Sequence, residues 1–278
     1  MVTTDVVVEG RHFSADLSDP EDWGWKAVAV NLSDLAAMGA EPRWLVVAMT
    51  VPPETGTALL DRVYAGLREA CLAFAVGLAG GDTSAGPVLS LAVTAIGEAE
   101  RVVTRAGARP GDRLAVSAPL GAAAAGLALL GRGDRQAGEL LERFPGLAAA
   151  HRRPQPQLAA GRRLAAAGAS AMIDVSDGLA GDALHLAEAS GTGLELDAAA
   201  VPAADGVAEA AALLGRDVLD LVLAGGEDFA IAAALPPDAP TAGAAVCGRF
   251  TADPARRVRR TPGGDLPLAG LAYDHFRR

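Results

Sequence analysis

Short apolar runs alternate with longer amphipathic segments along the first hundred residues. An apolar period near two is typical of a strand, and a period near 3.6 is typical of a helix. The pattern predicts strands over residues 3–8, 44–51 and 89–98, with helices over 27–38 and 54–74. Such alternation favours an α/β or α+β unit. We expect Ser33 or Asp34 to cap the first helix, which stops at Gly39.

A turn signal separates this unit from the rest of the chain. Pro110 and Gly111 lie between two apolar runs, and a Pro-Gly pair suits the centre of a type II turn. We place the domain boundary there, giving residues 1–108 and 109–278. Beyond it we expect a strand at 114–117 and an Ala-rich helix, and the same order of strand, tight loop and helix at 170–190.

The remaining segments are less regular. An Arg-rich stretch with several prolines and glycines, residues 132–157, suggests a mobile excursion from the core. We expect a strand at 193–197, a helix ending at Gly215, and apolar strands around 221–224 and 229–234.

Composition narrows the possible partners. The 278 residues carry a net charge of −10, which disfavours a polyanionic nucleic-acid partner. The apolar stretches are too short and too broken by glycine to cross a membrane. Cys71 and Cys247 lie far apart without CxxC spacing, and the first residues lack the order of a signal peptide. We interpret both as core thiols of a cytoplasmic protein.

Carboxylates gather in five short settings bounded by Gly, Ser or Thr. These settings are residues 3–5, 31–34, 80–84, 174–178 and 225–229. Mg²⁺ prefers oxygen ligands and is bound through a few carboxylates together with substrate phosphates. The four histidines lack the spacing of a zinc site. The pattern therefore indicates a site for a magnesium–nucleotide.

Each setting also has an ordinary structural interpretation. Asp34 and Asp177, taken singly, are more often helix caps, and Gly-Gly-Asp is common in turns. Asp182 and His185, three residues apart, are expected to pair locally. Asp5 is different because a bare carboxylate at an apolar strand end is costly. The same applies to Asp174, and the chain has no Walker, protein-kinase or nucleophile-elbow motif.

Taken together, ordered motifs give the chain a specific resemblance. They are TTDVVVEGRHF (3–13), AVNLSDLAAMGAEP (29–42), GGDTS (80–84), RPGD (109–112), MIDVSDGLAGD (172–182), GGEDF (225–229) and YDHF (273–276). In this order they resemble the thiamine-monophosphate kinase family, in the superfamily that also contains aminoimidazole ribonucleotide synthetase. The match runs through essentially the whole chain.

The resemblance implies a two-domain fold and a reaction. The N-terminal α/β domain would form a dimer-wide β-barrel in a homodimer, and the C-terminal domain would be α+β, with the site between them. The implied reaction is direct in-line transfer of the γ-phosphoryl group of ATP to thiamine phosphate, with several Mg²⁺ ions. Positioning and charge neutralisation dominate such chemistry.

The resemblance also implies roles for individual residues of this sequence that match the family's motifs. The metal-binding and catalytic set implied by the resemblance is Thr4, Asp5, Asp34, Asp82, Asp174 and Asp177. The implied ATP contacts are Gly81, Asp82, Arg105 and Ser176. The implied contacts to thiamine phosphate are His12 and Glu227, with Tyr273 or Phe276 stacking on its rings.

One departure from the family pattern concerns the N-terminus. The family has a further strand and an acidic GDDAA-type segment before the TTD motif, whereas this sequence begins two residues before Thr3. The resemblance therefore predicts a first domain without that strand and without one metal-binding aspartate.

Three alternatives to the kinase stay open at this point. One is another ATP-dependent enzyme of the superfamily, such as a relative of aminoimidazole ribonucleotide synthetase, although the contexts of His12 and Glu227 fit the thiamine enzyme better. A second is a nucleotide-binding protein inactivated by loss of the N-terminal segment. The third is a chain in which all five acidic settings are caps and turns.

Overall fold

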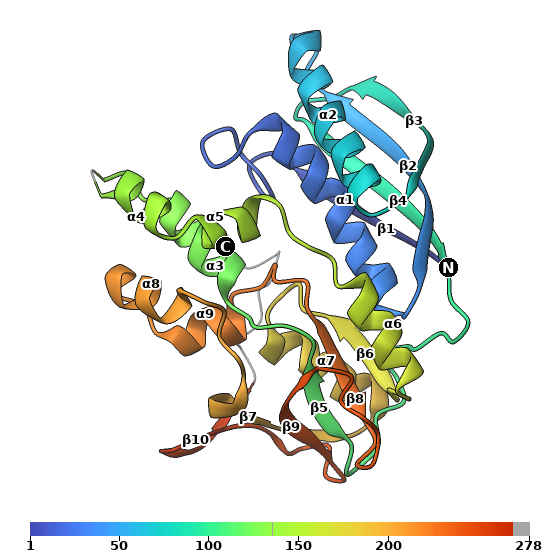
Figure 1. Ribbon diagram of the computed structural model, residues 1–278, viewed down its shortest axis with the longest axis vertical. Coiled ribbons are helices and arrows are strands. Elements are labelled where there is room, and N and C mark those ends of the chain that lie inside the picture. The colour runs from blue at the N-terminus through green and yellow to red at the C-terminus, as the bar shows by residue number, and fades with distance from the viewer. Residues whose placement is uncertain (135, 269–278) are drawn as a thin grey trace.

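The computed structural model describes residues 1–134 and 136–268, which form two sheets with helices packed against them (Figure 1). The first sheet has the order β1-β4-β2-β3. Its strands are β1 (Val2–Val8), β2 (Glu41–Val51), β3 (Gly77–Ala85) and β4 (Ser90–Glu98). Strand β4 pairs antiparallel with β1 and β2, whereas β2 and β3 are parallel. The parallel pair is connected by helix α2 (Thr57–Ala73), as a crossover requires.

The second sheet has seven strands in the order β11-β10-β7-β9-β5-β8-β6. They are β5 (Arg113–Val116), β6 (Ala171–Asp174), β7 (Gly193–Asp197), β8 (Ile231–Leu235), β9 (Ala245–Thr251), β10 (Arg257–Thr261) and β11 (Gly264–Pro267). One face of this sheet forms the larger core with helices α3 (Ala122–Leu130), α7 (Leu179–Ser190), α8 (Val207–Leu214) and α9 (Val218–Ala224). A short helix η1 (Ala198–Ala200) follows β7.

Helix α1 (Pro20–Ala37) connects the two sheets. Of its 18 residues only Glu21 and Asp34 are not buried. Its first part packs in the core of the first sheet, and Ala36 and Ala37 pack with helix α6 (Leu158–Ala166) on the other face of the second sheet (Figure 1). A helix buried in this way on nearly all sides is part of the interior of the protein.

Two glycines let α1 and α2 cross closely. A Cβ atom added at Gly24 would lie 2.1 Å from the Val63 carbonyl oxygen, and one added at Gly66 would lie 1.8 Å from the Glu21 carbonyl oxygen. Neither distance is possible for a real side chain, so the crossing requires glycine at both positions.

The beginning of α1 differs from the prediction and changes the role of two residues. The helix begins at Pro20, where proline suits the first helical position, and not at residue 27. Ser33 and Asp34 consequently lie inside its last turns, so the prediction that either caps the helix is wrong. The cap interpretation of Asp177 is also wrong, because Gly178 is the residue that precedes α7.

The Arg-rich stretch is part of the fold. It contains helices α4 (Ala137–Arg143) and α5 (Pro145–Arg152), and α5 packs against α3. Leu140, Phe144 and Leu147 are buried in the larger core. These apolar positions follow helical spacing, which the surrounding arginines and prolines obscured, so the prediction of a mobile excursion is wrong.

Two further segments have a secondary structure other than the one that the sequence predicts. Residues 218–224 form helix α9 and not a strand, because the Asp217 side chain accepts a hydrogen bond from the Leu219 amide at 2.9 Å and caps the helix. The Gly-Gly-Asp segment lies within strand β3 and not in a turn. The predicted turn at Pro110 and Gly111 is confirmed by a positive φ of 94° at Gly111 and a 3.0 Å bond from the Asp112 amide to the Arg109 carbonyl.

Both cysteines are buried and unbridged, as the sequence predicts for core thiols. Among the described residues, no helix combines the length and apolar character needed to span a bilayer. The four-stranded sheet is open within the described part of the single chain, with β1 and β3 at its edges.

Candidate functional site

Three carboxylates lie near the place where α1 passes between the sheets, and the charges of two of them act on the third. We call Asp5, Asp34 and Asp174 the acidic junction. Helix α1 reaches both flanking strands. The Thr3 hydroxyl donates to Asp34 Oδ2, and Asn31 Oδ1 accepts from the Asp5 amide at 2.9 Å. On the other side, Ser33 Oγ donates to Asp174 Oδ2 at 2.6 Å. The helix therefore fixes β1 relative to the end of β6.

Burial and neighbouring charges raise the pKa of two carboxyl groups at the junction. Burial, and then the charges of Asp34 and Asp5, raise the pKa of Asp174 to about 7, although the Ser33 hydroxyl opposes the change. Burial also raises the pKa of Asp34, against the Thr3 hydroxyl and the charge of Arg105. A bound cation would relieve this repulsion.

Asp182 organises the turn that follows Asp174. Its Oδ2 atom accepts from the amides of Ser176 and Asp177 at 3.0 and 3.1 Å, and the residue is 2% exposed. Burial, followed by the charges of Asp174 and Asp177, raises the pKa of Asp182 to about 8. The predicted local pair with His185 is wrong, because Asp182 points into the turn and His185 Nδ1 instead lies 3.9 Å from Glu188.

The 225–229 segment is held against the same turn. The Glu227 amide donates to the Ser176 carbonyl at 2.8 Å, and the Phe229 amide donates to the Val175 carbonyl at 2.9 Å. Glu227 and Phe229 have positive φ values of 57° and 50°, which are strained for residues other than glycine. The loop depends on its contacts for its shape.

Asp228 ties this loop to α3. Its carboxylate oxygens accept from the amides of Gly121 and Ala123 at 2.7 and 3.3 Å, at the start of that helix. Burial raises the pKa of Asp228 to about 6 against these bonds.

Glu227 and His12, both predicted to hold the acceptor, are linked through Lys26. Lys26 Nζ lies 2.8 Å from Glu227 Oε1 and donates to the His12 carbonyl oxygen at 3.0 Å. His151 Nδ1 lies 3.0 Å from Glu227 Oε2. Burial favours the neutral carboxyl, but Lys26 and His151 outweigh it and lower the pKa of Glu227 to about 2. His12 Nδ1 accepts from the Val8 amide at 3.0 Å.

Three of the predicted site residues lie away from the acidic junction. Across the first sheet, Asp5 lies opposite Val93, Val93 lies opposite Val47, and Val47 lies opposite Gly81, so Asp5 and Gly81 are three strands apart. Val47 and Val93 are buried on the face of the sheet that packs against α1. Three strand spacings amount to ~14 Å. Asp82 follows Gly81, and Thr4 precedes Asp5. Because side chains alternate along a strand, Asp82 and Thr4 point to the opposite, outer face.

At Gly81 an added Cβ would lie 2.0 Å from the Val47 carbonyl oxygen, so the strand pairing excludes a side chain there. Thr4 Oγ1 donates to the Val93 carbonyl at 3.0 Å, and it is Thr3 that reaches Asp34.

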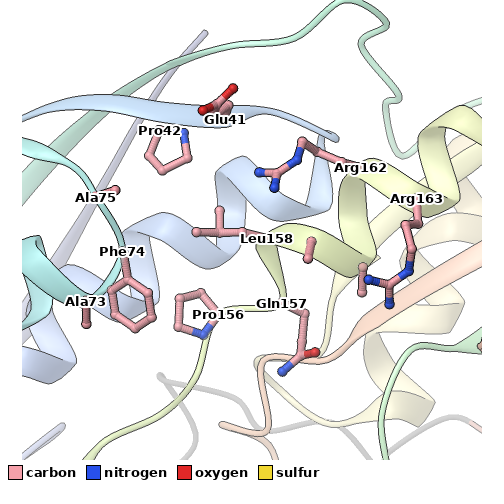
Figure 2. A pocket seen from close by; sticks show the side chains of 12 residues that line it. Glu41, Pro42, Ala73, Phe74, Ala75, Pro156, Gln157, Leu158, Arg162 and Arg163 are labelled. Atoms are coloured by element: carbon pink, nitrogen blue, oxygen red, sulfur yellow. The ribbon is translucent and has the colours of Figure 1, made fainter.

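The acidic junction opens into a small pocket of about 160 Å³. Thr3, Asp34, Arg105 and Asp174 are among its lining residues. A larger pocket, about 380 Å³, is lined by Phe74, Pro156, Leu158, Arg162 and neighbouring residues (Figure 2). None of the predicted site residues that the structure describes lines the larger pocket, so the smaller one is the better candidate for the reaction.

The donor set suits a hard cation that also takes ligands from a substrate. Within residues 1–134 and 136–268, no three His, Cys, Asp or Glu residues are grouped closely enough to hold a metal ion by themselves. The junction nevertheless offers several carboxylates whose like charges repel one another, which fits Mg²⁺ completed by phosphate and water oxygens. Tyr273 and Phe276 lie outside the described residues.

Sequence reasoning missed four polar residues of this region: Thr3, Ser33, Lys26 and His151. The prediction that Ser33 caps a helix depends on a helix that begins near residue 27, whereas α1 begins at Pro20. Lys26 precedes the predicted helix, and His151 lies in the stretch that was expected to be mobile. The sequence does contain one indication for Lys26, because a lysine within an apolar segment is expected to need a partner if that segment is buried.

Two protein-family models match most of the chain. The model for AIR synthase related protein, N-terminal domain, matches residues 1–99, and the model for the C-terminal domain matches residues 109–258.

Individual relatives narrow this class. Thiamine-monophosphate kinase of Mycobacterium tuberculosis is 42% identical over 259 residues, which are 92% of this chain and 75% of the relative. The crystal structure of thiamine monophosphate kinase from Aquifex aeolicus superposes with a TM-score of 0.85 at 31% identity, covering 96% of this chain and 88% of that chain. AaThiL complexed with AMPPCP and TMP gives a TM-score of 0.82 at 32% identity, covering 91% and 81%. The chain belongs to the thiamine-monophosphate kinase family of AIR synthase related proteins.

The raised pKa values at the junction predict a pH-dependent stability. The pKa of Asp174 is near 7 in the folded state, above its ordinary 3.8, so folding favours the protonated form. The resulting stabilisation is full below pH 3.8, falls as the pH rises and is lost above pH 7. In EDTA, the free energy of unfolding should drop between pH 5.5 and 8. Asp174→Asn should reduce this drop by ~2 kcal/mol, because about 1.5 pH units of the range over which the stabilisation is lost fall in this interval.

Denaturant unfolding at the two pH values measures the effect. The exposed Asp238→Asn variant serves as the matched control and should behave as the parent does. An unchanged pH dependence in Asp174→Asn would contradict the assignment.

Proposed function

We propose that this chain transfers the γ-phosphoryl group of ATP to thiamine phosphate, giving ADP and thiamine diphosphate. The observation that carries the proposal is the joining of the acidic junction to the 225–229 loop through the turn at Val175 and Ser176. Phosphoryl transfer requires both a phosphate-binding cluster and an acceptor site at one place. Family membership and a related structure bound to AMPPCP, an ATP analogue, and TMP support the same activity.

The donor half of the proposed site surrounds the acidic junction. Asp5, Asp34 and Asp174 would hold Mg²⁺, together with Asp177. Thr4 and Asp82, which lie on the outer face of the first sheet, would contribute only to the site of a second copy of the chain. When bound, the metal would neutralise the negative charge of the phosphates. Arg105, whose charge already acts on Asp34, would contact the phosphates of ATP, and Ser176 and Gly81 complete the proposed nucleotide contacts.

The acceptor half of the site lies at His12 and Glu227, with Tyr273 or Phe276 stacking on the rings of thiamine phosphate. In the in-line step, a phosphate oxygen of the acceptor forms a bond to the γ-phosphorus while the bond to the β–γ bridging oxygen breaks, and ADP leaves. The chain contributes by aligning the two substrates, which supplies most of the rate enhancement in such reactions.

We also propose a homodimer formed through the outer face of the first sheet. Val2, Val6, Trp44, Val46 and Ile96 are exposed there, and an exposed apolar group of this kind is typical of an interface. Two such sheets facing one another would make the dimer-wide barrel. The domains would divide at residues 1–108 and 109–278. The free thiols suit a cytoplasmic enzyme.

Dimerisation would explain the position of Asp82. It lies on the outer face and ~14 Å from the strand of Asp5, so it is better placed to serve the site of a second copy than its own. The prediction concerns mixed dimers of Asp5→Asn and Asp82→Asn chains. Half of a random mixture would be mixed dimers with one intact site, so the mixture should recover about a quarter of the parent activity.

The activity of the co-expressed mixture measures this recovery, and mixed dimers isolated through two different affinity tags should have about half of the parent activity because one of their two sites is intact. Each variant alone should be inactive. A mixture as inactive as its components would place Asp5 and Asp82 in the same chain's site.

Direct detection of product tests the activity itself. The protein is incubated with ATP, Mg²⁺ and thiamine phosphate, and thiamine diphosphate is measured by chromatography. We expect product to accumulate, and we expect Asp5→Asn to lower its rate by at least about a hundredfold because charge neutralisation is lost. Binding of ATP without any product would instead favour a nucleotide-binding protein or a different acceptor.

A further inference from the structure

Lys26 is the only lysine among the 24 lysines and arginines of the chain. It is also 3% exposed, although lysine is almost never buried without a partner. At every other cationic position the chain has arginine, whose planar guanidinium is larger and binds through a fork. Lys26 therefore provides the only lysine ammonium group of the chain, and it lies at a buried position.

The ammonium group of Lys26 makes three close contacts, to both carboxylate oxygens of Glu227 and to one backbone oxygen. Its distances are 2.8 Å to Oε1 and 2.9 Å to Oε2 of Glu227, and 3.0 Å to the His12 carbonyl oxygen. An ammonium has three protons to donate, so these contacts occupy it fully. Lys26 is thus placed to hold other residues and not to bind a substrate directly.

The contacts of Lys26 cross from one sheet to the other. Lys26 and His12 belong to the part of the chain that packs on the first sheet, whereas Glu227 lies in the loop before β8 of the second sheet. The loop's other anchors are bonds to Val175, Ser176 and the start of α3, which belong to the second half. Lys26 therefore sets the position of Glu227 relative to His12.

His151 approaches Glu227 from a segment that is fastened to α1 and its surroundings. The Trp25 indole donates to the Pro154 carbonyl at 2.9 Å, and Arg152 Nε donates to the Leu17 carbonyl at 2.7 Å. Arg153 pairs with Asp22 and lies over the Trp25 ring. These contacts keep His151 in place, so Glu227 is confined between His151 and Lys26.

We propose that Lys26 is a positioning residue of the acceptor site, which fixes the Glu227 carboxylate and the His12 backbone in one arrangement across the two halves of the molecule. The inference rests on the proposed function in taking His12 and Glu227 as the acceptor site. The strained loop at Glu227 would relax without Lys26, because its shape depends on contacts. Thiamine phosphate binding would then weaken while ATP binding would not.

Kinetic constants for both substrates test this separation. Lys26→Met should raise the KM for thiamine phosphate at least about tenfold, the loss expected for a hydrogen bond to a charged group, and should change the KM for ATP less than twofold. Lys26→Arg keeps the charge and should recover part of the loss. Arg62→Met is the matched control, since Arg62 also pairs with α1 but is half exposed, and it should leave both constants unchanged.

A double variant shows whether Lys26 acts through Glu227. If it does, the double variant Lys26→Met with Glu227→Gln should raise the KM for thiamine phosphate no more than the more damaging of the two single variants does. Multiplied effects, or an equal rise in the KM for ATP, would overturn the proposal.

A binding measurement on the parent protein covers the case in which the variants fail to fold. Lysine enriched in carbon-13 at Cε gives a single side-chain NMR signal, because the chain has one lysine. We expect thiamine phosphate alone to shift this signal and AMPPCP with Mg²⁺ to leave it unshifted. An unshifted signal with thiamine phosphate in a protein that makes thiamine diphosphate would overturn the proposal. A shift in a protein that makes no product would support it and would count against the kinase activity alone.

Discussion

Burial of α1 on all sides is the constraint on which the rest of the structure depends. The helix packs against the first sheet through its early residues and against the second sheet through Ala36 and Ala37, so each half of the molecule is built on it. Gly24 and Gly66 allow α2 to approach closely enough to complete this burial. Polar residues inside such a helix are costly unless they are paired, and those of α1 are paired with the site. Lys26, Asn31 and Ser33 each bond across to a different segment.

Two opposite electrostatic situations result along this one helix. At its C-terminal end, burial together with the charges of Asp34 and Asp5 raises the pKa of Asp174 to about 7. Two turns earlier, Lys26 compensates Glu227, and the pKa of that carboxyl falls to about 2. The first arrangement suits a ligand that brings positive charge, as a magnesium–nucleotide does. The second is already neutral as a pair, so it can define the shape of an acceptor site without attracting a metal.

Much of this could be predicted from the sequence, and the failures have physical causes. Strand and helix types followed from periodicity at most positions, and the turn at Pro110 and Gly111 from the conformations these residues favour. The prediction of a strand around 221–224 is wrong because a short apolar run is compatible with either a strand or a helix, and here Asp217 caps a helix. The 80–84 segment was misassigned because its glycines do not resemble a strand, although Gly81 is required by close pairing with Val47. His151 could not be placed because its partner lies 76 positions further along the chain, and only tertiary packing brings them together.

In the function we propose, the acidic junction binds the nucleotide, and His12 and Glu227 hold the acceptor. A crystal structure with Mn²⁺ in place of Mg²⁺, AMPPCP and thiamine phosphate tests it most directly, because anomalous scattering locates the metal. We expect manganese beside Asp5, Asp34 and Asp174, and thiamine phosphate in contact with Glu227. Manganese remote from these carboxylates, or the nucleotide in the larger pocket at Phe74 and Leu158, would contradict it.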